Sequence, residues 1–154
     1  MPSLGPIENF SSSQFSVDEV HKIAILDLRI LNLDRNACNI LVQETLDKNT
    51  GKLERKLIPI DHGLTIPDSL EIFSYDIDWL AYDQAYEPFS EKSLAYIKNL
   101  RVDKDIAMLE RNFKIRPECL RNMKLSTILL QEGAKRGLNL AQICSVLCRP
   151  DEDD

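Results

Sequence analysis

Three polar residues in two short segments have the types and spacing that phosphoryl transfer requires. Asp34 and Asn39 are five residues apart within residues 32–41, and Asp61 follows a short apolar run within residues 57–63. In phosphoryl transfer one carboxylate accepts the proton of the attacking hydroxyl, while an amide and a second carboxylate hold Mg²⁺ against the nucleotide phosphates. We therefore expect Asp34 to be the catalytic base, and Asn39 and Asp61 to bind Mg²⁺ and, through it, ATP.

The combination of the two segments makes this pattern informative. Alone, Asp34 is typical of the turn that ends a helix. A second acid in the sequence Asp61-His62-Gly63, after a predicted strand, favours phosphoryl transfer, which depends mainly on positioning and charge neutralisation. Arg35 belongs to the same candidate catalytic group, and two roles stay open for it: action on the phosphate, or pairing with a carboxylate that stabilises the loop.

A β-hairpin would bring these residues together. Residues 40–42 and 57–60 are strand candidates, and residues 47–51 between them have the composition of a turn whose final glycine adopts a positive φ. Such a hairpin carries Asn39 at one end and Asp61 at the other, although the two are distant in sequence. We therefore expect the two candidate metal ligands to lie side by side.

The remainder of the chain is predicted to be mainly helical. Residues 17–31 form a helix capped by Ser16 or Asp18, and its apolar positions are dense enough for burial on most sides. Asp27 and Arg29 within it are interpreted as structural polar positions. Further helices are expected over residues 90–100, residues 103–112, the stretch from Pro117 to near Gly137, and residues 139–149.

The predicted fold class is α+β: a mainly helical lobe with a small β-hairpin that carries the metal-binding residues. Residues 1–16 are rich in serine, proline and glycine and are predicted to be flexible. Residues 17–149 form the lobe, and residues 150–154 form an acidic, solvated tail. Within the lobe, residues 64–88 mix proline, aromatic and acidic positions, which indicates an ordered loop with short helical pieces.

Composition and charge limit the classes of function. The 154 residues are enough for one domain with a core, and 44% hydrophobic and 29% charged residues are typical of a globular protein. A net charge of −6 argues against a general nucleic-acid binder and against broad electrostatic attraction to anionic membranes. The sequence shows neither an apolar stretch long enough to span a bilayer nor a secretory signal.

The cysteine pattern indicates a reducing compartment. The four cysteines include no C-x-x-C pair, and the two histidines are distant in sequence from the pair Cys144 and Cys148. A zinc site would need more ligands than these, so we expect buried or free thiols. A cytoplasmic protein is the resulting expectation.

Several segments together resemble a known family. Residues 21–42, with Asp34-Arg35 and Asn39, resemble the catalytic domain of phosphatidylinositol 3- and 4-kinases, as do residues 57–63 and residues 87–90. Within that family the chain is most similar to the type II and the plant-type gamma phosphatidylinositol 4-kinases, over about residues 5–149. The resemblance implies a kinase-like C-terminal lobe that uses Mg²⁺ and ATP and transfers the γ-phosphate to the inositol hydroxyl of phosphatidylinositol.

The chain departs from the family pattern at several places. Asn36 and Cys38 stand where the plant-type sequence D-R-H-A-G-N has histidine and glycine, and we expect Cys38 to strain the loop because glycine tolerates dihedral angles that cysteine does not. No glycine-rich loop precedes His21, and the one lysine before Asp34 is Lys22, on the predicted helix. The expectation is therefore a C-terminal catalytic lobe whose N-terminal lobe is missing.

Three functions stay open for such a lobe. The three alternatives are a phosphatidylinositol 4-kinase-like transferase, a protein Ser/Thr kinase of the same fold, and a non-catalytic interaction module derived from a kinase lobe. The expected partners are ATP, a phosphatidylinositol or protein acceptor, and either the missing lobe or another protein on the apolar face left open. Any membrane attachment is expected to be peripheral.

Overall fold

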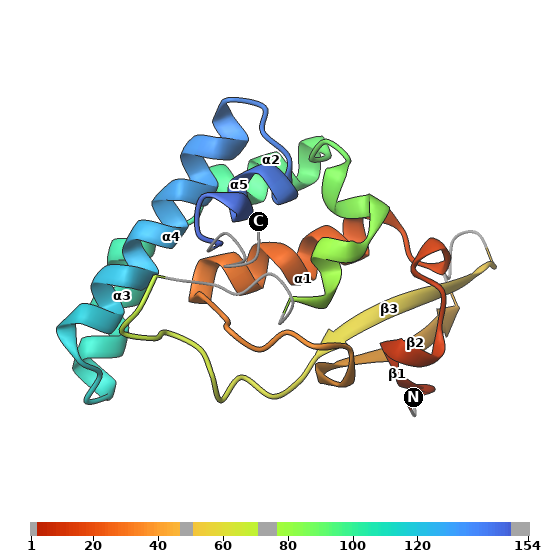
Figure 1. Ribbon diagram of the computed structural model, residues 1–154, viewed down its shortest axis with the longest axis horizontal. Helices are drawn as coiled ribbons and strands as arrows, with labels where there is room; N and C mark the ends of the chain where they lie inside the picture. The colour runs from red at the N-terminus through yellow and green to blue at the C-terminus, as the bar shows by residue number, and fades with distance from the viewer. Residues whose placement is uncertain (1–2, 47–50, 71–76, 149–154) are drawn as a thin grey trace, which may run out of the picture.

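Helices occupy one side of the molecule and a small antiparallel sheet occupies the other (Figure 1). The computed structural model describes residues 3–46, 51–70 and 77–148. Its α-helices are α1 (Val17–Ile30), α2 (Glu91–Lys98), α3 (Val102–Asn112), α4 (Pro117–Lys135) and α5 (Leu140–Ser145). Its strands are β1 (Gly5–Pro6), β2 (Ile40–Leu46) and β3 (Leu53–Pro59). Short 3₁₀ helices are η1 (Ile7–Asn9), η2 (Ser12–Gln14), η3 (Ala37–Asn39), η5 (Asp78–Ala81) and η6 (Asp83–Tyr86). This mixture of helices and a small sheet agrees with the predicted α+β class.

Helix α1 runs through the middle of the molecule and supports the loop that follows it (Figure 1). It begins after Ser16, whose hydroxyl oxygen accepts the Glu19 N–H at 3.3 Å, and acidic residues in its first turn complement the helix dipole. Most of its positions between Val20 and Leu28 are buried, as the dense apolar pattern predicts. The helix ends at Ile30, and the next residue, Leu31, adopts the left-handed conformation with a φ of 49°, so the chain turns directly into the candidate catalytic loop.

The predicted hairpin is confirmed as strands β2 and β3. Val42 lies opposite Leu57 and both are buried, while Leu41 lies opposite Ile58 on the other face, where Ile58 is 40% exposed. This alternation gives the sheet one face toward the core and one face away from it. Gly51, at the end of the predicted turn, has a φ of 69°, and residues 47–50 lie outside the described part of the chain.

The N-terminal segment differs from the flexible stretch predicted for residues 1–16. Strand β1 pairs with β2 as a third, antiparallel strand, so that Gly5 lies opposite Val42. Ile7 and Phe15 are 1% and 4% exposed and belong to the main apolar core. Burial of these two side chains and the edge pairing together order a segment whose composition, read alone, favours a loop.

The C-terminal helices pack on α1 from the side away from the sheet. Pro117 occupies the first turn of α4 and Gly137 follows its end with a φ of 76°, as predicted. Ser126 and Thr127 on α4 donate hydroxyl hydrogens to main-chain oxygens of Leu28 and Arg29. These contacts satisfy carbonyl groups that the end of α1 leaves without helical partners.

The last helix and the long loop are partly as predicted. Helix α5 begins after Asn139 with a capping box to Gln142, but it ends at Ser145, earlier than the predicted residue 149. The predicted tail over residues 150–154 lies outside the described residues. The loop over residues 64–88 contains the predicted short helical pieces, η5 and η6, and residues 71–76 within it are likewise outside the description.

Candidate active site

The loop after α1 is shaped by asparagine side chains. Asn32 accepts the Asp34 N–H through Oδ1 at 3.0 Å and donates through Nδ2 to Asp27 at 3.1 Å. Asn36 donates through Nδ2 to the Asp34 carboxylate at 2.6 Å and accepts the Cys38 N–H at 3.0 Å, which caps η3. These local bonds, two to backbone N–H groups and two to carboxylates, fix a loop that has little regular structure of its own.

Asp34 and Asn39 are in direct contact. The Asn39 amide nitrogen donates to the main-chain oxygen of Asp34 at 3.1 Å and to its Oδ2 at 3.4 Å. Both side chains are partly buried, so each is reachable from solvent. Because the amide nitrogen points to Asp34, the amide oxygen is the Asn39 atom that could ligate a metal ion.

The hairpin brings Asp61 next to Asn39, as predicted. Ile40 lies opposite Pro59, and the Ile60 N–H donates to the main-chain oxygen of Asn39 at 2.9 Å. Asp61 is therefore the next residue beyond the paired ends of the strands. Asp61 is exposed and adopts a φ of 49°, and its carboxylate accepts the Gly63 N–H at 3.2 Å. The backbone of Asp61 therefore lies at the same end of the sheet as Asn39, which in turn contacts Asp34.

The donor set fits a hard cation. Oxygen atoms of one amide and one carboxylate are ligands that Mg²⁺ accepts, because Mg²⁺ usually binds one or two carboxylates and takes its other ligands from phosphates and water. Across the described residues, no group of three or more His, Cys, Asp or Glu side chains could hold a metal ion. Asn39 and Asp61 offer one amide oxygen and one carboxylate, which is the kind of partial set that Mg²⁺ takes when phosphates and water supply its other ligands.

Arg35 has a different environment from the one that a phosphate-contacting residue needs. Its side chain is 0% exposed, and its Nε lies 3.1 Å from both carboxylate oxygens of Asp27. Its Nη1 donates to the main-chain oxygens of Asn39 and Ile60, each at 2.7 Å. The sequence left two roles open for Arg35, and this geometry corresponds to loop stabilisation. The direct catalytic contact predicted by its grouping with Asp34 does not fit, because a guanidinium without exposed surface cannot reach a bound phosphate.

Asp27 is a site-related residue whose importance sequence reasoning missed. It is 2% exposed and accepts hydrogen bonds from Arg35, from Asn32 and from the Trp79 indole N–H at 3.0 Å. Burial raises the pKa of its carboxyl group, and the donors from Arg35, Asn32 and Trp79 oppose that shift by favouring the charged form. The feature of the sequence that could have indicated this role is an acidic residue on a helix whose neighbouring positions are mostly apolar.

The expected strain at Cys38 is absent. The non-glycine residues with a positive φ in the described chain are Leu31, Asp61 and Ile66, so Cys38 has an ordinary backbone conformation. The Asn36 cap allows this conformation because it starts η3 with extended dihedral angles. The strained position of the site is instead the candidate metal ligand Asp61.

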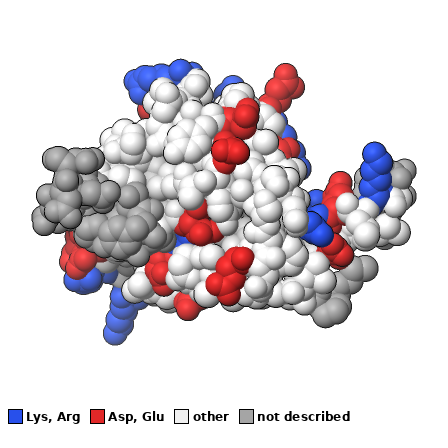
Figure 2. Space-filling model, turned by 45° about the vertical axis from the view of Figure 1, so that its right-hand side comes forward, with Lys and Arg blue, Asp and Glu red and all other residues white. Residues whose placement is uncertain are grey.

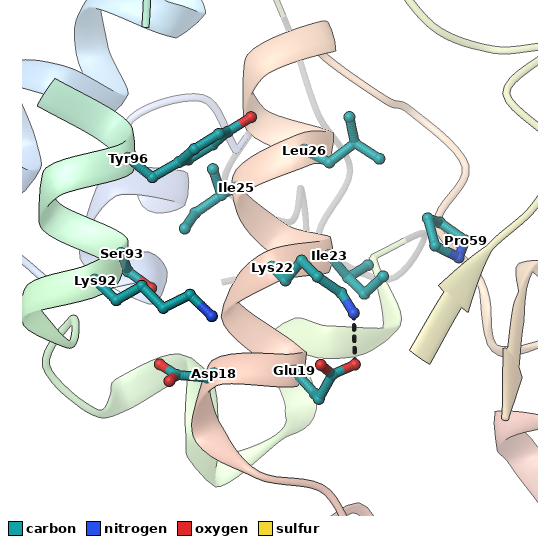
Figure 3. Close-up of a pocket in the computed structure, with 10 residues that line it drawn as sticks. All are labelled: Asp18, Glu19, Lys22, Ile23, Ile25, Leu26, Pro59, Lys92, Ser93 and Tyr96. Carbon is teal, nitrogen blue, oxygen red and sulfur yellow. Dashed lines mark hydrogen bonds and ion pairs between the residues drawn. The ribbon is translucent and has the colours of Figure 1, made fainter. Parts of the chain in front are cut away.

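A pocket of about 420 Å³ lies apart from these residues, between α1, α2 and the end of β3 (Figure 3). Ile25, Leu26 and Tyr96 contribute apolar surface, and Lys22 at its wall is ion-paired with Glu19 at 2.5 Å. None of the predicted site residues lines this pocket. The candidate active site is therefore defined by the loop and hairpin ends and not by this cavity.

The face of the molecule shown in Figure 2 carries no patch of basic side chains at its centre. Acidic side chains are scattered across the face shown in Figure 2, and the described basic side chains lie mostly toward its edges. The net charge of −6 agrees with this distribution. In the described part of the chain, none of the helices is long and apolar enough to cross a bilayer.

Comparison with known proteins identifies the family. The family model described as phosphatidylinositol 3- and 4-kinase matches residues 4–143, which include every candidate site residue. The chain therefore belongs to the phosphatidylinositol 3- and 4-kinase family. This confirms the resemblance on which the sequence-based interpretation relied.

Individual relatives are plant enzymes of the gamma group. The chain is 45% identical over 146 residues to phosphatidylinositol 4-kinase gamma 4 of Oryza sativa subsp. japonica, with 94% of this chain and 25% of the relative covered. It is 41% identical over 148 residues to phosphatidylinositol 4-kinase gamma 3 of Arabidopsis thaliana, with 96% and 25% covered. It is 45% identical over 140 residues to phosphatidylinositol 4-kinase gamma 6 of Arabidopsis thaliana, with 90% and 22% covered. The chain thus spans about a quarter of the length of these relatives.

Proposed function

We propose that this chain provides the catalytic base and the metal ligands of a phosphatidylinositol 4-kinase-like transferase, which moves the γ-phosphate of ATP to the inositol hydroxyl of phosphatidylinositol. The observation that supports this proposal is the end of the hairpin, where the Ile60 N–H, one residue before Asp61, bonds to the main-chain oxygen of Asn39. The contact between Asn39 and Asp34 adds the candidate base to the same place. Family membership supports the same chemistry.

Each residue has a defined role in this proposal. Asp34 accepts the proton of the acceptor hydroxyl, and the side-chain amides of Asn36 and Asn39 hold its carboxylate in position. Asn39 Oδ1 and the Asp61 carboxylate hold Mg²⁺, which when bound neutralises charge on the ATP phosphates. Arg35 positions Asn39 and Asp61 through hydrogen bonds to the main-chain oxygens of Asn39 and Ile60, and it does not touch the substrate.

The outer face of the sheet supports the proposal of a further partner. Ile58 and Ile60 are 40% and 37% exposed, and Leu4 beside β1 is 48% exposed. We propose that another part of the protein, or a second protein, covers this face, because grouped apolar side chains of this kind commonly mark contact surfaces. The same observation favours the second candidate function, a non-catalytic interaction module that binds a protein through this face.

Calorimetric titration of the chain with Mg-ATP tests the proposed metal site. We expect the wild-type chain to bind and the Asp61→Asn variant to lose binding, because the amide removes the charge that holds Mg²⁺. Asp103→Asn is the matched control, since Asp103 is an exposed aspartate on α3, outside the site, and it should bind as the wild type does. Absence of binding to the wild-type chain would leave the interaction module as the better account.

The acceptor is tested with labelled ATP. The chain is offered phosphatidylinositol vesicles and a Ser/Thr-containing protein in the same reaction, and the label is followed into each. Label in the lipid that disappears with Asp34→Ala supports the lipid kinase, and label in the protein supports the protein kinase of the same fold. Unchanged transfer by Asp34→Ala would rule out the role given to Asp34.

A further inference from the structure

We propose that Trp79 and Asp27 are positioning residues that connect the segment 77–86 to the two candidate metal ligands. The connection runs from the Trp79 indole through the Asp27 carboxylate and the Arg35 guanidinium to the backbone that carries Asn39 and Asp61. That the connection ends at metal ligands rests on the proposed function, in which Asn39 and Asp61 bind Mg²⁺. The contacts themselves are features of the structure and do not depend on that assignment.

The first contact joins the loop segment to α1. Trp79 lies in η5 and is 1% exposed, and its Nε1–H donates to Asp27 Oδ2 at 3.0 Å. A buried indole N–H requires an acceptor, and a carboxylate is a stronger acceptor than a neutral oxygen. The position of the Trp79 ring is therefore tied to the position of the Asp27 carboxylate.

The second contact is a buried ion pair between Asp27 and Arg35, in which Nε donates to the carboxylate and Nη2 lies close to it without forming a hydrogen bond. Arg35 Nε is 3.1 Å from both Asp27 oxygens, and Nη2 is 3.0 Å from Oδ1. The guanidinium is planar and its donors have fixed directions, so the orientation of Asp27 determines the orientation of Arg35. Neither side chain has more than 2% of its surface exposed, which leaves water little access to substitute for either partner.

The third contact reaches the backbone of the metal site. Arg35 Nη1 donates to the main-chain oxygens of Asn39 and Ile60 at 2.7 Å each, and these residues are themselves joined by the Ile60 N–H to Asn39 oxygen bond. One of the two oxygens belongs to a candidate ligand and the other precedes Asp61. A single nitrogen atom, Arg35 Nη1, therefore holds the backbone at Asn39 and the backbone next to Asp61 at a fixed separation.

The segment 77–86 also holds Arg35 through its backbone. Ile77 forms an isolated parallel bridge with Arg35, and the Asp78 N–H donates to the Arg35 oxygen at 2.9 Å. Two neighbouring residues of the segment thus fix the Arg35 main chain, while Trp79 fixes its side chain through Asp27. Groups that orient metal ligands without touching the metal commonly change metal affinity. Displacement of this segment should therefore weaken metal binding, and the coupling is reciprocal.

Trp79→Phe tests the connection because it removes the indole N–H and keeps an aromatic ring. Mn²⁺, which reports its own binding in electron paramagnetic resonance, is titrated into the wild-type and variant chains with ATP present. We expect the Mn²⁺ affinity of Trp79→Phe to fall by about tenfold or more. Tyr96→Phe is the matched control, since it removes a tyrosine hydroxyl on α2 that accepts from Arg29, outside the segment 77–86, and leaves Asp27, Arg35 and Asp78 untouched. Its Mn²⁺ affinity should equal that of the wild type.

Amide hydrogen exchange at Ile60 provides a readout that needs no metal. We expect the Ile60 N–H to exchange about tenfold faster in Trp79→Phe, while the amide of Leu130, buried in α4, keeps its relative rate. A uniform acceleration at both amides would show general destabilisation and overturn the proposal, as would an unchanged Ile60 rate or an equal effect of Tyr96→Phe. If the wild-type chain binds no Mn²⁺, the proposed function fails, and the Ile60 rate still decides the connection.

Discussion

The Asp27 carboxylate and the Arg35 guanidinium form an ion pair that is closed to solvent, with Nη2 and Oδ1 3.0 Å apart and the two side chains 2% and 0% exposed. Removal of two charges from water is costly, and their mutual attraction offsets this cost when further hydrogen bonds satisfy the remaining donors and acceptors. Asn32 and Trp79 donate to the carboxylate, and two carbonyl oxygens accept from Arg35 Nη1, while Nη2 has no hydrogen-bond partner among the described atoms. The pair is thus the centre of a polar network inside the core.

Asp27→Ala should destabilise the protein strongly. It leaves the Arg35 charge buried without its partner, and we expect the free energy of unfolding to fall by about 3–5 kcal/mol. Urea unfolding followed by circular dichroism measures the change. The exposed pair Lys124–Asp103 provides the control, and Asp103→Ala should lower the free energy by about 1 kcal/mol or less. Equal losses in the two variants would mean that the buried pair has no special role in stability.

Asp61→Gly should separate stability from metal binding. Asp61 has a φ of 49°, which glycine adopts without strain and alanine does not, so we expect Asp61→Gly to be more stable than Asp61→Ala by about 1 kcal/mol. Both variants lack the carboxylate and should lose Mg-ATP binding in calorimetry. Equal stability of the two variants would indicate that this residue leaves the left-handed conformation in solution. Retained binding by either would remove Asp61 from the metal site.

The parts of the fold that were predictable depend on local signals. The cap at Ser16, the proline at the start of α4 and the positive φ of Gly51 and Gly137 are each determined by residue type and near neighbours. The hairpin followed from its turn composition, and with it the adjacency of Asn39 and Asp61. These features are determined by hydrophobic periodicity and by the residue types of turns, both of which can be read from neighbouring residues in the sequence.

The parts that were not predictable depend on distant partners. The Trp79–Asp27 hydrogen bond joins residues 52 positions apart, and nothing near Asp27 in sequence indicates that its acceptor atoms face an indole. The role of Arg35 depends on the same network, so the sequence left two roles open. Strand β1 has two residues, too few for a period, and Ile7 is buried by contacts from elsewhere in the chain.

Gly133→Ala should destabilise the packing of α4 on α5. A Cβ at position 133 would lie 2.5 Å and 2.8 Å from side-chain carbons of Ile143, which is 0% exposed and cannot move aside. Alanine gains about 1 kcal/mol over glycine in a helix, whereas overpacking costs about 1–3 kcal/mol. We therefore expect a net fall in the free energy of unfolding, measured by urea denaturation.

The background variant Ile143→Ala reverses the sign of that effect. It removes the carbon atoms that the new Cβ would meet, and only the helix preference of alanine remains. Gly133→Ala should therefore stabilise the Ile143→Ala protein, and the double-mutant cycle should give a coupling free energy of about 0.5–3 kcal/mol. Additive effects of the two substitutions would show that residue 133 and Ile143 do not pack as described.

His21 should make the protein sensitive to mild acid. Its Nε2–H donates to the Gln84 main-chain oxygen at 2.7 Å, and its Nδ1 is buried without a hydrogen-bond partner among the described atoms. Burial lowers the pKa of His21 from its ordinary value of about 6.5, opposed by the Gln84 bond and by the charges of Asp18 and Glu87. The unfolded chain therefore takes up a proton at a higher pH than the native protein does. The stabilisation is complete above pH of about 6.5 and is lost as the pH falls from there toward the native pKa.

The slope of stability against pH measures this effect. We expect the free energy of unfolding to fall as the pH falls below about 6.5, because the native pKa of His21 is lower than that of the unfolded chain. In His21→Gln, which cannot titrate but keeps a donor for the Gln84 oxygen, most of this slope should disappear. His62→Gln is the matched control because it makes the same substitution at an exposed histidine and leaves His21 in place. A slope that survives in His21→Gln would assign the acid sensitivity to carboxylates instead, since these groups would then be taking up the protons that destabilise the native state.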